Sequence, residues 1–146
     1  MKKILSIIAV LIFVFAACDS GDIKGGRYFG TFQNTKNNKY ETGSLSFKYE
    51  KISDTTCFFM NGILPMIRVD ENKYAGVVGN QLGNRLNDLL ATIPAIDSIQ
   101  VCDSLETIVQ LNADAEFKGN SVKATLLFTT YPDSTKVSVE FVGYNE

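Results

Sequence analysis

The C-terminal third of the chain alternates clearly between apolar and polar positions. Every second residue between 109 and 117 is apolar, and the alternation returns at 122–128 and 137–141. Lys118-Gly119-Asn120 and Tyr131-Pro132-Asp133-Ser134 separate these stretches and are typical of turns. A period of two places successive side chains on opposite faces of a strand. We therefore expect a three-strand antiparallel meander with one buried face.

Shorter strands are predicted upstream. Residues 27–33 form a first strand, and residues 42–51 alternate, with Leu45, Phe47 and Tyr49 on the apolar face. Two short apolar runs, at 56–60 and 63–69, are separated by Asn61-Gly62. Because proline cannot donate a ladder hydrogen bond, Pro65 predicts an edge strand or an irregular strand for the second run.

One segment has a helical period. Its apolar residues recur three or four positions apart and form one stripe, made of Leu82, Leu86, Leu89, Leu90 and Ile93. The stripe predicts a helix over about residues 80–92 that Pro94 ends. We interpret it as core, the alternative being a groove for a partner. The glycine-rich stretch 76–83 lacks the lysine-serine ending of a phosphate loop, and helix–sheet packing explains its glycines.

These elements predict a mostly β fold. We expect an antiparallel β-sandwich or flattened barrel of about 7–8 strands, with one short helix and the C-terminal three-strand meander. The length after the leader fits a single β-rich domain over residues 27–146.

The N-terminus is typical of an exported lipoprotein. Lys2 and Lys3 precede a stretch at 4–17 that is apolar apart from Ser6 and too short to span a bilayer. Phe15-Ala16-Ala17-Cys18 resembles a lipobox, although the family pattern usually has leucine where Phe15 stands. We expect a signal peptide at 1–17, acylation of Cys18 and a lipidated tether over 18–26. The alternatives are a cleaved signal peptide with a chance cysteine, or an N-terminal helical anchor.

Composition argues against several function classes. The sequence has no histidine, which removes the commonest general acid–base and metal ligand, and no tryptophan. Removing Lys2 and Lys3 with the leader takes the formal net charge from −2 to −4, and no basic stripe points to nucleic acid. We expect no catalytic site, no metal and no cofactor. Asp70-Glu71-Asn72 lacks the ligand spacing of a calcium loop, and Asp97, Asp103 and Glu106 have no nucleophile to assist.

Two cysteines follow Cys18. An exported location permits a Cys57–Cys102 disulfide, but spacing alone cannot fix its geometry. The alternative is two buried thiols that act as small hydrophobic residues.

Two short motifs carry resemblances. Gly26-Arg27-Tyr28-Phe29-Gly30-Thr31 resembles the G-x-Y-x-G opening of small lipocalin-like or calycin-like domains in lipoproteins of Bacteroidetes-type bacteria, which implies fold and location more than activity. Asp followed by Ser or Thr resembles the O-glycosylation acceptor of exported proteins of such bacteria. The candidate acceptors are Thr55, Ser98, Ser104 and Ser134. The alternative is that these are ordinary turn and cap residues.

The expected function is therefore that of a non-enzymatic binding or accessory domain. It would be held by Cys18 in the cell envelope, at the outer membrane, on its periplasmic face or at the cell surface. A small apolar or glycan ligand would be lined by inward-facing aromatic residues, namely Tyr28, Phe32, Tyr49, Phe58 and Phe128. The alternative is a protein-interaction or inhibitor module that acts on an envelope enzyme or complex.

Overall fold

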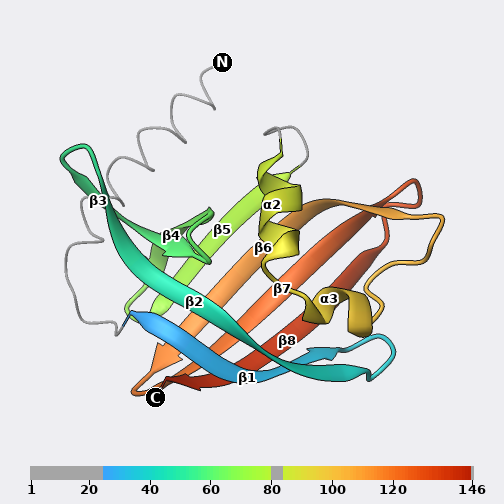
Figure 1. The fold of residues 1–146 in the computed structure, drawn as a ribbon, viewed down its shortest axis with the longest axis horizontal. Coiled ribbons are helices and arrows are strands. Elements are labelled where there is room, and N and C mark those ends of the chain that lie inside the picture. Colours follow the sequence, from blue (N-terminus) through green and yellow to red (C-terminus); the bar gives the residue numbers. More distant parts are fainter. Residues whose placement is uncertain (1–24, 80–83, 146) are drawn as a thin grey trace.

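The structure, a computed structural model, describes residues 25–79 and 84–145. Eight antiparallel strands follow one another around a closed barrel in chain order, and β8 pairs with β1 (Figure 1). The strands are β1 (Gly26–Asn34), β2 (Tyr40–Ile52), β3 (Thr55–Met60), β4 (Leu64–Asp70), β5 (Lys73–Gly79), β6 (Thr107–Lys118), β7 (Ser121–Tyr131) and β8 (Lys136–Asn145). The predicted fold class, a mostly β flattened barrel with few helices, is confirmed.

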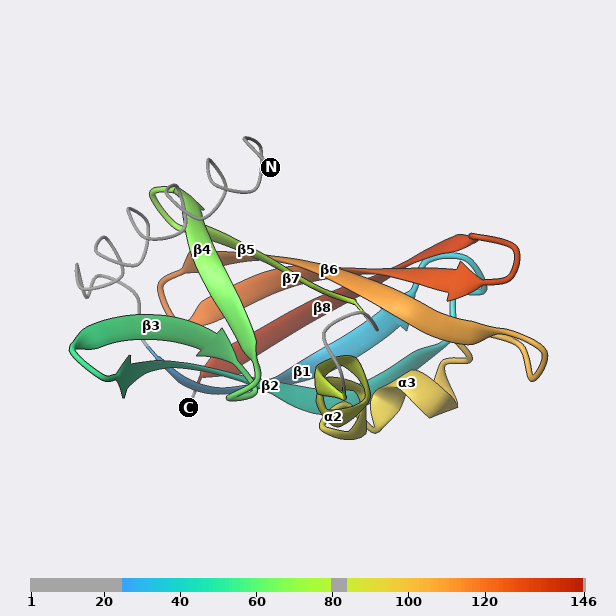
Figure 2. The same ribbon diagram turned by 90° about the horizontal axis from the view of Figure 1, so that it is seen from above.

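Up-and-down order gives the barrel two distinct ends. We call the end at which β1 begins and β8 finishes the proximal end. It also carries the short turns at 53–54, 71–72 and 119–120. The other end, here the distal end, carries the loop at 35–39, the turn at 132–135 and the long connection from β5 to β6. The two helices lie in that connection, next to each other in Figure 2. α2 contacts β5 and β6, and α3 contacts β2.

The C-terminal meander is formed as expected. β6 pairs with β7 along its length, with a register shift between Ile108 and Gln110, and β7 pairs with β8 from Ser121 to Thr129. The sequence interpretation assigned no strand to residues 73–79, which form β5. The inward positions of β5 are Tyr74, Gly76 and Val78. The glycine in the middle interrupts the apolar alternation that would have predicted a strand. A β-carbon on Gly76 would come within 2.6 Å of the Pro65 carbonyl oxygen, so this glycine allows β5 to approach β4 closely.

The irregularity that Pro65 predicts is present. β4 has neighbours on both sides, so it is not an edge strand, but its pairing with β5 covers only the stretch from Ile67 to Asp70 and contains a register shift. Pro65 is paired in register with Phe59 of β3 but lies outside the stretch paired with β5.

The predicted helix is shorter than expected and is followed by a second one. α2 spans Arg85–Ala91, and the expected start near residue 80 lies outside the described residues. Leu86, Leu89 and Ile93 are buried, which supports the interpretation of the apolar stripe as core. Pro94 ends the first helix and is also the N-cap of α3 (Ala95–Ser98), because a proline φ near −60° suits a helix start.

A close contact between strands accompanies the closure of the barrel. A β-carbon on Gly30 would come within 1.8 Å of the Val142 carbonyl oxygen, so only glycine allows β1 and β8 to meet at this point. Tyr28, two residues earlier, is fully buried in the core. The glycine and tyrosine of the opening motif therefore have structural roles in the barrel.

Candidate functional site

The proximal half of the barrel interior is filled by aromatic rings. Phe117 contacts four other rings, with centroid separations between 5.0 and 6.0 Å, namely those of Tyr28, Phe47, Phe58 and Tyr74. Phe58 also packs against Tyr49, at 4.9 Å, and Tyr74, at 4.5 Å. Burial in this cluster raises the pKa of Tyr28, and a hydrogen bond from Asn145 acts in the opposite direction.

The five residues predicted to line a ligand belong to the core. Tyr28, Tyr49 and Phe58 lie in the aromatic cluster, Phe32 packs against Phe141 with centroids 4.5 Å apart, and Phe128 is fully buried. None of the five lines the hollows near Asp114, Asn61, Cys102 or Thr31. A ligand among these rings would have to displace side chains that already contact one another.

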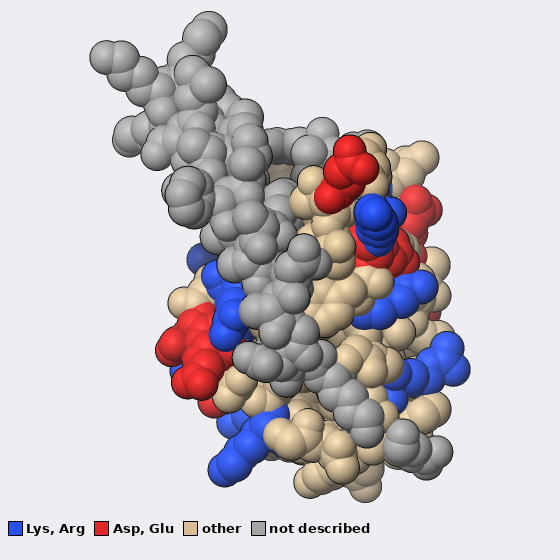
Figure 3. All heavy atoms as spheres, turned by 90° about the vertical axis from the view of Figure 1, so that its left-hand side faces the viewer, with Lys and Arg blue, Asp and Glu red and all other residues tan. Residues whose placement is uncertain are grey.

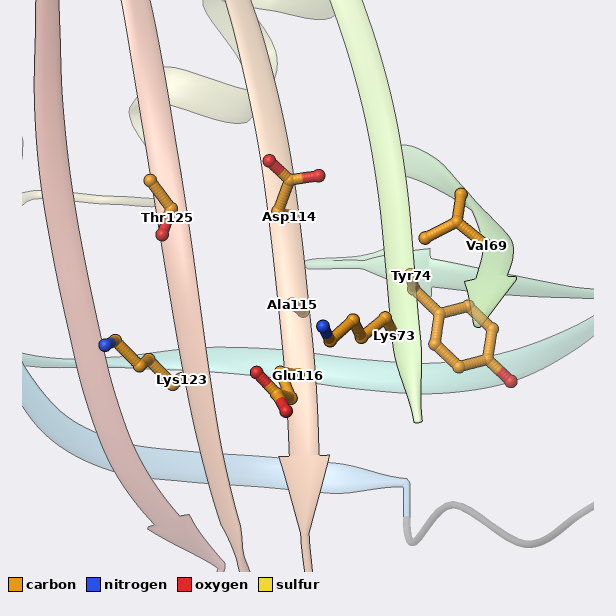
Figure 4. Close-up of a pocket in the computed structure, with 8 residues that line it drawn as sticks. All are labelled: Val69, Lys73, Tyr74, Asp114, Ala115, Glu116, Lys123 and Thr125. Carbon is orange, nitrogen blue, oxygen red and sulfur yellow. The ribbon is translucent and has the colours of Figure 1, made fainter. Parts of the chain in front are cut away.

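A shallow hollow of about 340 Å³ lies on the outer face of β5, β6 and β7 (Figure 4). Lys73, Glu116 and Lys123 lie opposite one another on the three strands, and Asp114 and Thr125 occupy the next row. These charged side chains form no ion pair with one another, and Lys48–Glu50 at 3.1 Å is the one salt bridge found within residues 25–79 and 84–145. Exposed charges of mixed sign that form no ion pair with one another are typical of a solvated surface.

The distal loops are joined by side-chain hydrogen bonds. Asn34 is buried at the end of β1, and its Nδ2 donates to the carbonyl oxygens of Ile99, at 3.0 Å, and Gln100, at 3.3 Å. Its Oδ1 accepts from the backbone N–H of Lys36 at 3.0 Å. Asn37 Nδ2 donates to the same Ile99 oxygen at 3.1 Å. The loop at 35–39 is thereby fixed to the segment that follows α3.

The third distal loop is attached in the same way. Thr130, buried at the end of β7, donates its hydroxyl to Glu106 Oε2 at 2.5 Å, and its backbone N–H donates to the Thr135 carbonyl at 2.9 Å. The sequence interpretation treated Asn34 as a loop residue and assigned no role to Thr130. No pattern of apolar spacing identifies a buried polar residue, since its polar neighbours come from distant segments.

These loops surround a hollow of about 350 Å³. We call this hollow, together with the exposed Leu105 and Tyr131 beside it, the distal surface. The hollow is lined by Lys36, Asn37, Gln100, Val101, Cys102, Asp103, Glu106, Thr135 and Val137. Leu105, with 90% of its side chain exposed, and Tyr131, with 63% exposed, lie in or next to the same loops. Large apolar side chains beside a polar hollow are typical of a contact surface.

Both described cysteines are free thiols, so the possible Cys57–Cys102 disulfide is not formed in this structure. Cys57 is buried on β3 and Cys102 is half-buried on the distal surface, as in the alternative of separate thiols. Burial raises the pKa of both thiols, and for Cys102 the carboxylates of Glu106, Asp103 and Asp97 raise it further.

The four candidate glycosylation acceptors are exposed. Ser98, Ser104 and Ser134 lie at the distal end, and Thr55 opens β3 at the proximal end. Exposure is required of an acceptor and is also expected of a turn residue, so both interpretations stay open.

The predicted leader, Cys18 and all of the predicted tether before Gly25 lie outside the described residues. No helix in the described part of the chain is long and apolar enough to cross a membrane. Within the same residues, no group of three or more Cys, Asp or Glu side chains is arranged to hold a metal ion.

No protein-family model, curated protein or solved structure matches this chain. Any function must therefore be argued from the residues and the geometry of the chain itself.

Proposed function

We propose that this chain is a lipid-anchored, non-enzymatic binding domain of the cell envelope that contacts a protein partner through its distal surface. One observation carries the proposal. The apolar side chains inside the barrel are buried and pack against one another, whereas the distal loops are fixed by hydrogen bonds into one surface with exposed Leu105 and Tyr131. Ordered loops that carry exposed apolar side chains suit recognition of a protein better than enclosure of a small ligand.

The anchor and the strand order support the same arrangement. Cys18 follows a positively charged, apolar leader and precedes β1 by eight residues. Because β1 runs from the proximal end to the distal end, an acylated Cys18 would keep the proximal end near the membrane and present the distal surface away from it. The eight-stranded up-and-down barrel also supports the lipocalin-like resemblance of the opening motif.

The anchor is tested by mass spectrometry of the protein extracted from its native membrane. We expect the chain to begin at Cys18 and to carry the added mass of a diacylglycerol and an acyl chain. Cys18→Ser should release the protein into the soluble fraction. An intact leader, or an unmodified cysteine in the membrane-bound protein, would overturn the anchor.

The binding surface is tested by photo-crosslinking in intact cells. A crosslinking amino acid at Leu105 or Tyr131 should give one protein adduct, and the same amino acid at Val69, exposed on β4, should give none. The adduct is identified by mass spectrometry, and its affinity for the anchored protein is then measured. We expect Leu105→Asp to weaken that affinity at least about tenfold, as for a residue central to an interface, and Val69→Asp to leave it unchanged. Equal effects of the two substitutions would contradict a distal binding surface.

The hypothesis of a small apolar or glycan ligand is separable from this proposal. Native mass spectrometry of the extracted protein would detect a ligand that stays bound. A retained ligand that is lost on Phe58→Ala, but not on Leu105→Asp, would support an interior site in place of the distal surface.

A further inference from the structure

A small apolar patch lies on the outside of the barrel near the proximal end. Phe29 on β1 and Tyr144 on β8 are directly opposite each other in the ladder, and Val142 lies two residues from Tyr144. Phe29 is 47% exposed, Tyr144 62% and Val142 44%. The neighbouring outward positions on β1 and β2 are Thr31, Thr42 and Ser44. We call Phe29, Val142 and Tyr144 the aromatic patch.

A basic residue adjoins this patch. The Arg27 guanidinium lies 6.0 Å from the centroid of the Phe29 ring, and no carboxylate in the described part of the chain forms an ion pair with it. Arg27 lines a hollow of about 280 Å³ together with the hydroxyl groups of Ser44 and Ser46 and with Lys48, which is paired with Glu50. The Thr92 hydroxyl and the Asn61 amide also line it, but they are hydrogen-bonded within the protein. Positive charges together with hydroxyl donors are the groups that bind a phosphate in proteins.

The position of the patch along the chain limits what it can meet. β1 begins at Gly26, and eight residues of extended chain reach at most about 29 Å. If Cys18 is acylated, as the proposed function requires, Gly26 cannot lie farther than that reach from the membrane surface, and Arg27 and Phe29 follow it directly on β1. A short tether also raises the effective concentration of the surface to the order of millimolar. A contact with a dissociation constant well below a millimolar would then be occupied most of the time.

We propose that the aromatic patch and Arg27 rest on the lipid bilayer that holds the anchor. The rings of Phe29 and Tyr144 enter the boundary between headgroups and acyl chains, and Arg27 binds a lipid phosphate. Aromatic rings beside a basic side chain are typical of protein surfaces at this depth. Lys and Arg are interspersed with Asp and Glu over the proximal end (Figure 3), so the rings, rather than net charge, supply most of the attraction. The contact fixes the orientation of the barrel and leaves the distal surface in water.

The absence of tryptophan makes the contact measurable with a single fluorescent reporter. The acylated protein is extracted, reconstituted into phosphatidylcholine vesicles that contain brominated acyl chains, and compared as Phe29→Trp and Tyr131→Trp variants. We expect the emission of the Phe29→Trp variant to shift to shorter wavelength and to be quenched at least about twofold more than that of the distal Tyr131→Trp variant. Tyr144→Trp provides a second reporter on the same patch. Equal quenching at the patch and at the distal position would overturn the inference.

The contact between Arg27 and a lipid phosphate is tested by comparing a substitution of Arg27 with a substitution of another basic residue at the proximal end. In the Phe29→Trp background, Arg27→Gln should reduce the quenching, whereas Lys118→Gln, at the proximal end of β6, should not. Equal effects would overturn the role of Arg27. The acyl mass on Cys18 is measured in the same samples. A missing acyl mass overturns the proposed anchor and this inference together, whereas an acylated protein with equal quenching overturns this inference alone.

Discussion

The two ends of the barrel are held by different forces. At the proximal end, the rings of Tyr28, Phe47, Phe58, Tyr74 and Phe117 contact one another, and the connecting turns are short. At the distal end, long connections are fixed by the buried side chains of Asn34 and Thr130. Ring packing is the sum of many weak contacts to several neighbours, whereas a buried amide depends on two or three specific partners.

This difference separates the residues that stabilise the barrel from those of the proposed binding surface. Loss of a core ring removes contacts to several strands at once, so the whole barrel is destabilised. Loss of a distal hydrogen bond releases only the loops that it joins, because the strands beneath keep their own ladders. The distal loops can therefore change in sequence without loss of the fold, as expected of a recognition surface on a fixed scaffold.

The largest expected effect is that of Phe117→Ala. This change removes a ring that contacts four others and leaves a cavity in the proximal core, so we expect the free energy of unfolding to fall by about 3–5 kcal/mol. Urea denaturation followed by circular dichroism measures the loss. Phe29→Ala, on the outer surface, is the control and should change stability by no more than about 0.5 kcal/mol. A loss below about 1 kcal/mol for Phe117→Ala would show that the rings do not hold this end.

Asn34→Ala should have a smaller and more local effect. It leaves the Ile99 carbonyl without its Asn34 donor and removes the bond to the Lys36 N–H, so we expect a loss of about 1–3 kcal/mol. Hydrogen exchange should accelerate in residues 35–39 and 99–106 and stay unchanged in β6 and β7. Asn37→Ala, whose amide is exposed to water, should have less effect. Faster exchange throughout the barrel in Asn34→Ala would contradict the separation of the two ends.

Local sequence patterns predicted the strands that pair with their neighbours in the chain through short turns. The alternation in β6, β7 and β8 is strict, because each strand buries one face against the core, and it identified all three. β5 escaped prediction because glycine occupies the middle of its buried face, and α3 because Pro94 was interpreted only as the end of a helix. Both errors come from residues, Gly76 and Pro94, that usually interrupt a strand or a helix but here allow close strand packing and begin a helix.

Features built by distant segments could not be predicted. The pairing of β1 with β8 joins the two ends of the domain, and its close contact at Gly30 depends on the Val142 backbone. The aromatic patch likewise needs this pairing to bring Phe29 beside Tyr144. Whether Tyr28 and Phe58 would surround a ligand or fill the interior depends on the side chains opposite them, which periodicity does not specify.

The smallest expected effect concerns the Cys102 thiol at the distal surface. Its pKa is raised by burial and by Glu106, Asp103 and Asp97, so less thiolate is present near neutral pH than for a free cysteine, whose pKa is about 8.5. Because the thiolate is the reactive form, alkylation of Cys102 by iodoacetamide should be slower than that of a free cysteine and should accelerate as the pH rises. Glu106→Gln removes one negative charge and keeps an acceptor for Thr130, so it should lower the pKa and speed alkylation at pH 8 about threefold. Peptide mapping separates Cys102 from buried Cys57, and Glu116→Gln, on the outer face of β6, is the control. If the two variants react at the same rate, the carboxylates of the distal surface do not act on this thiol, and the loops are held less closely together than their hydrogen bonds indicate.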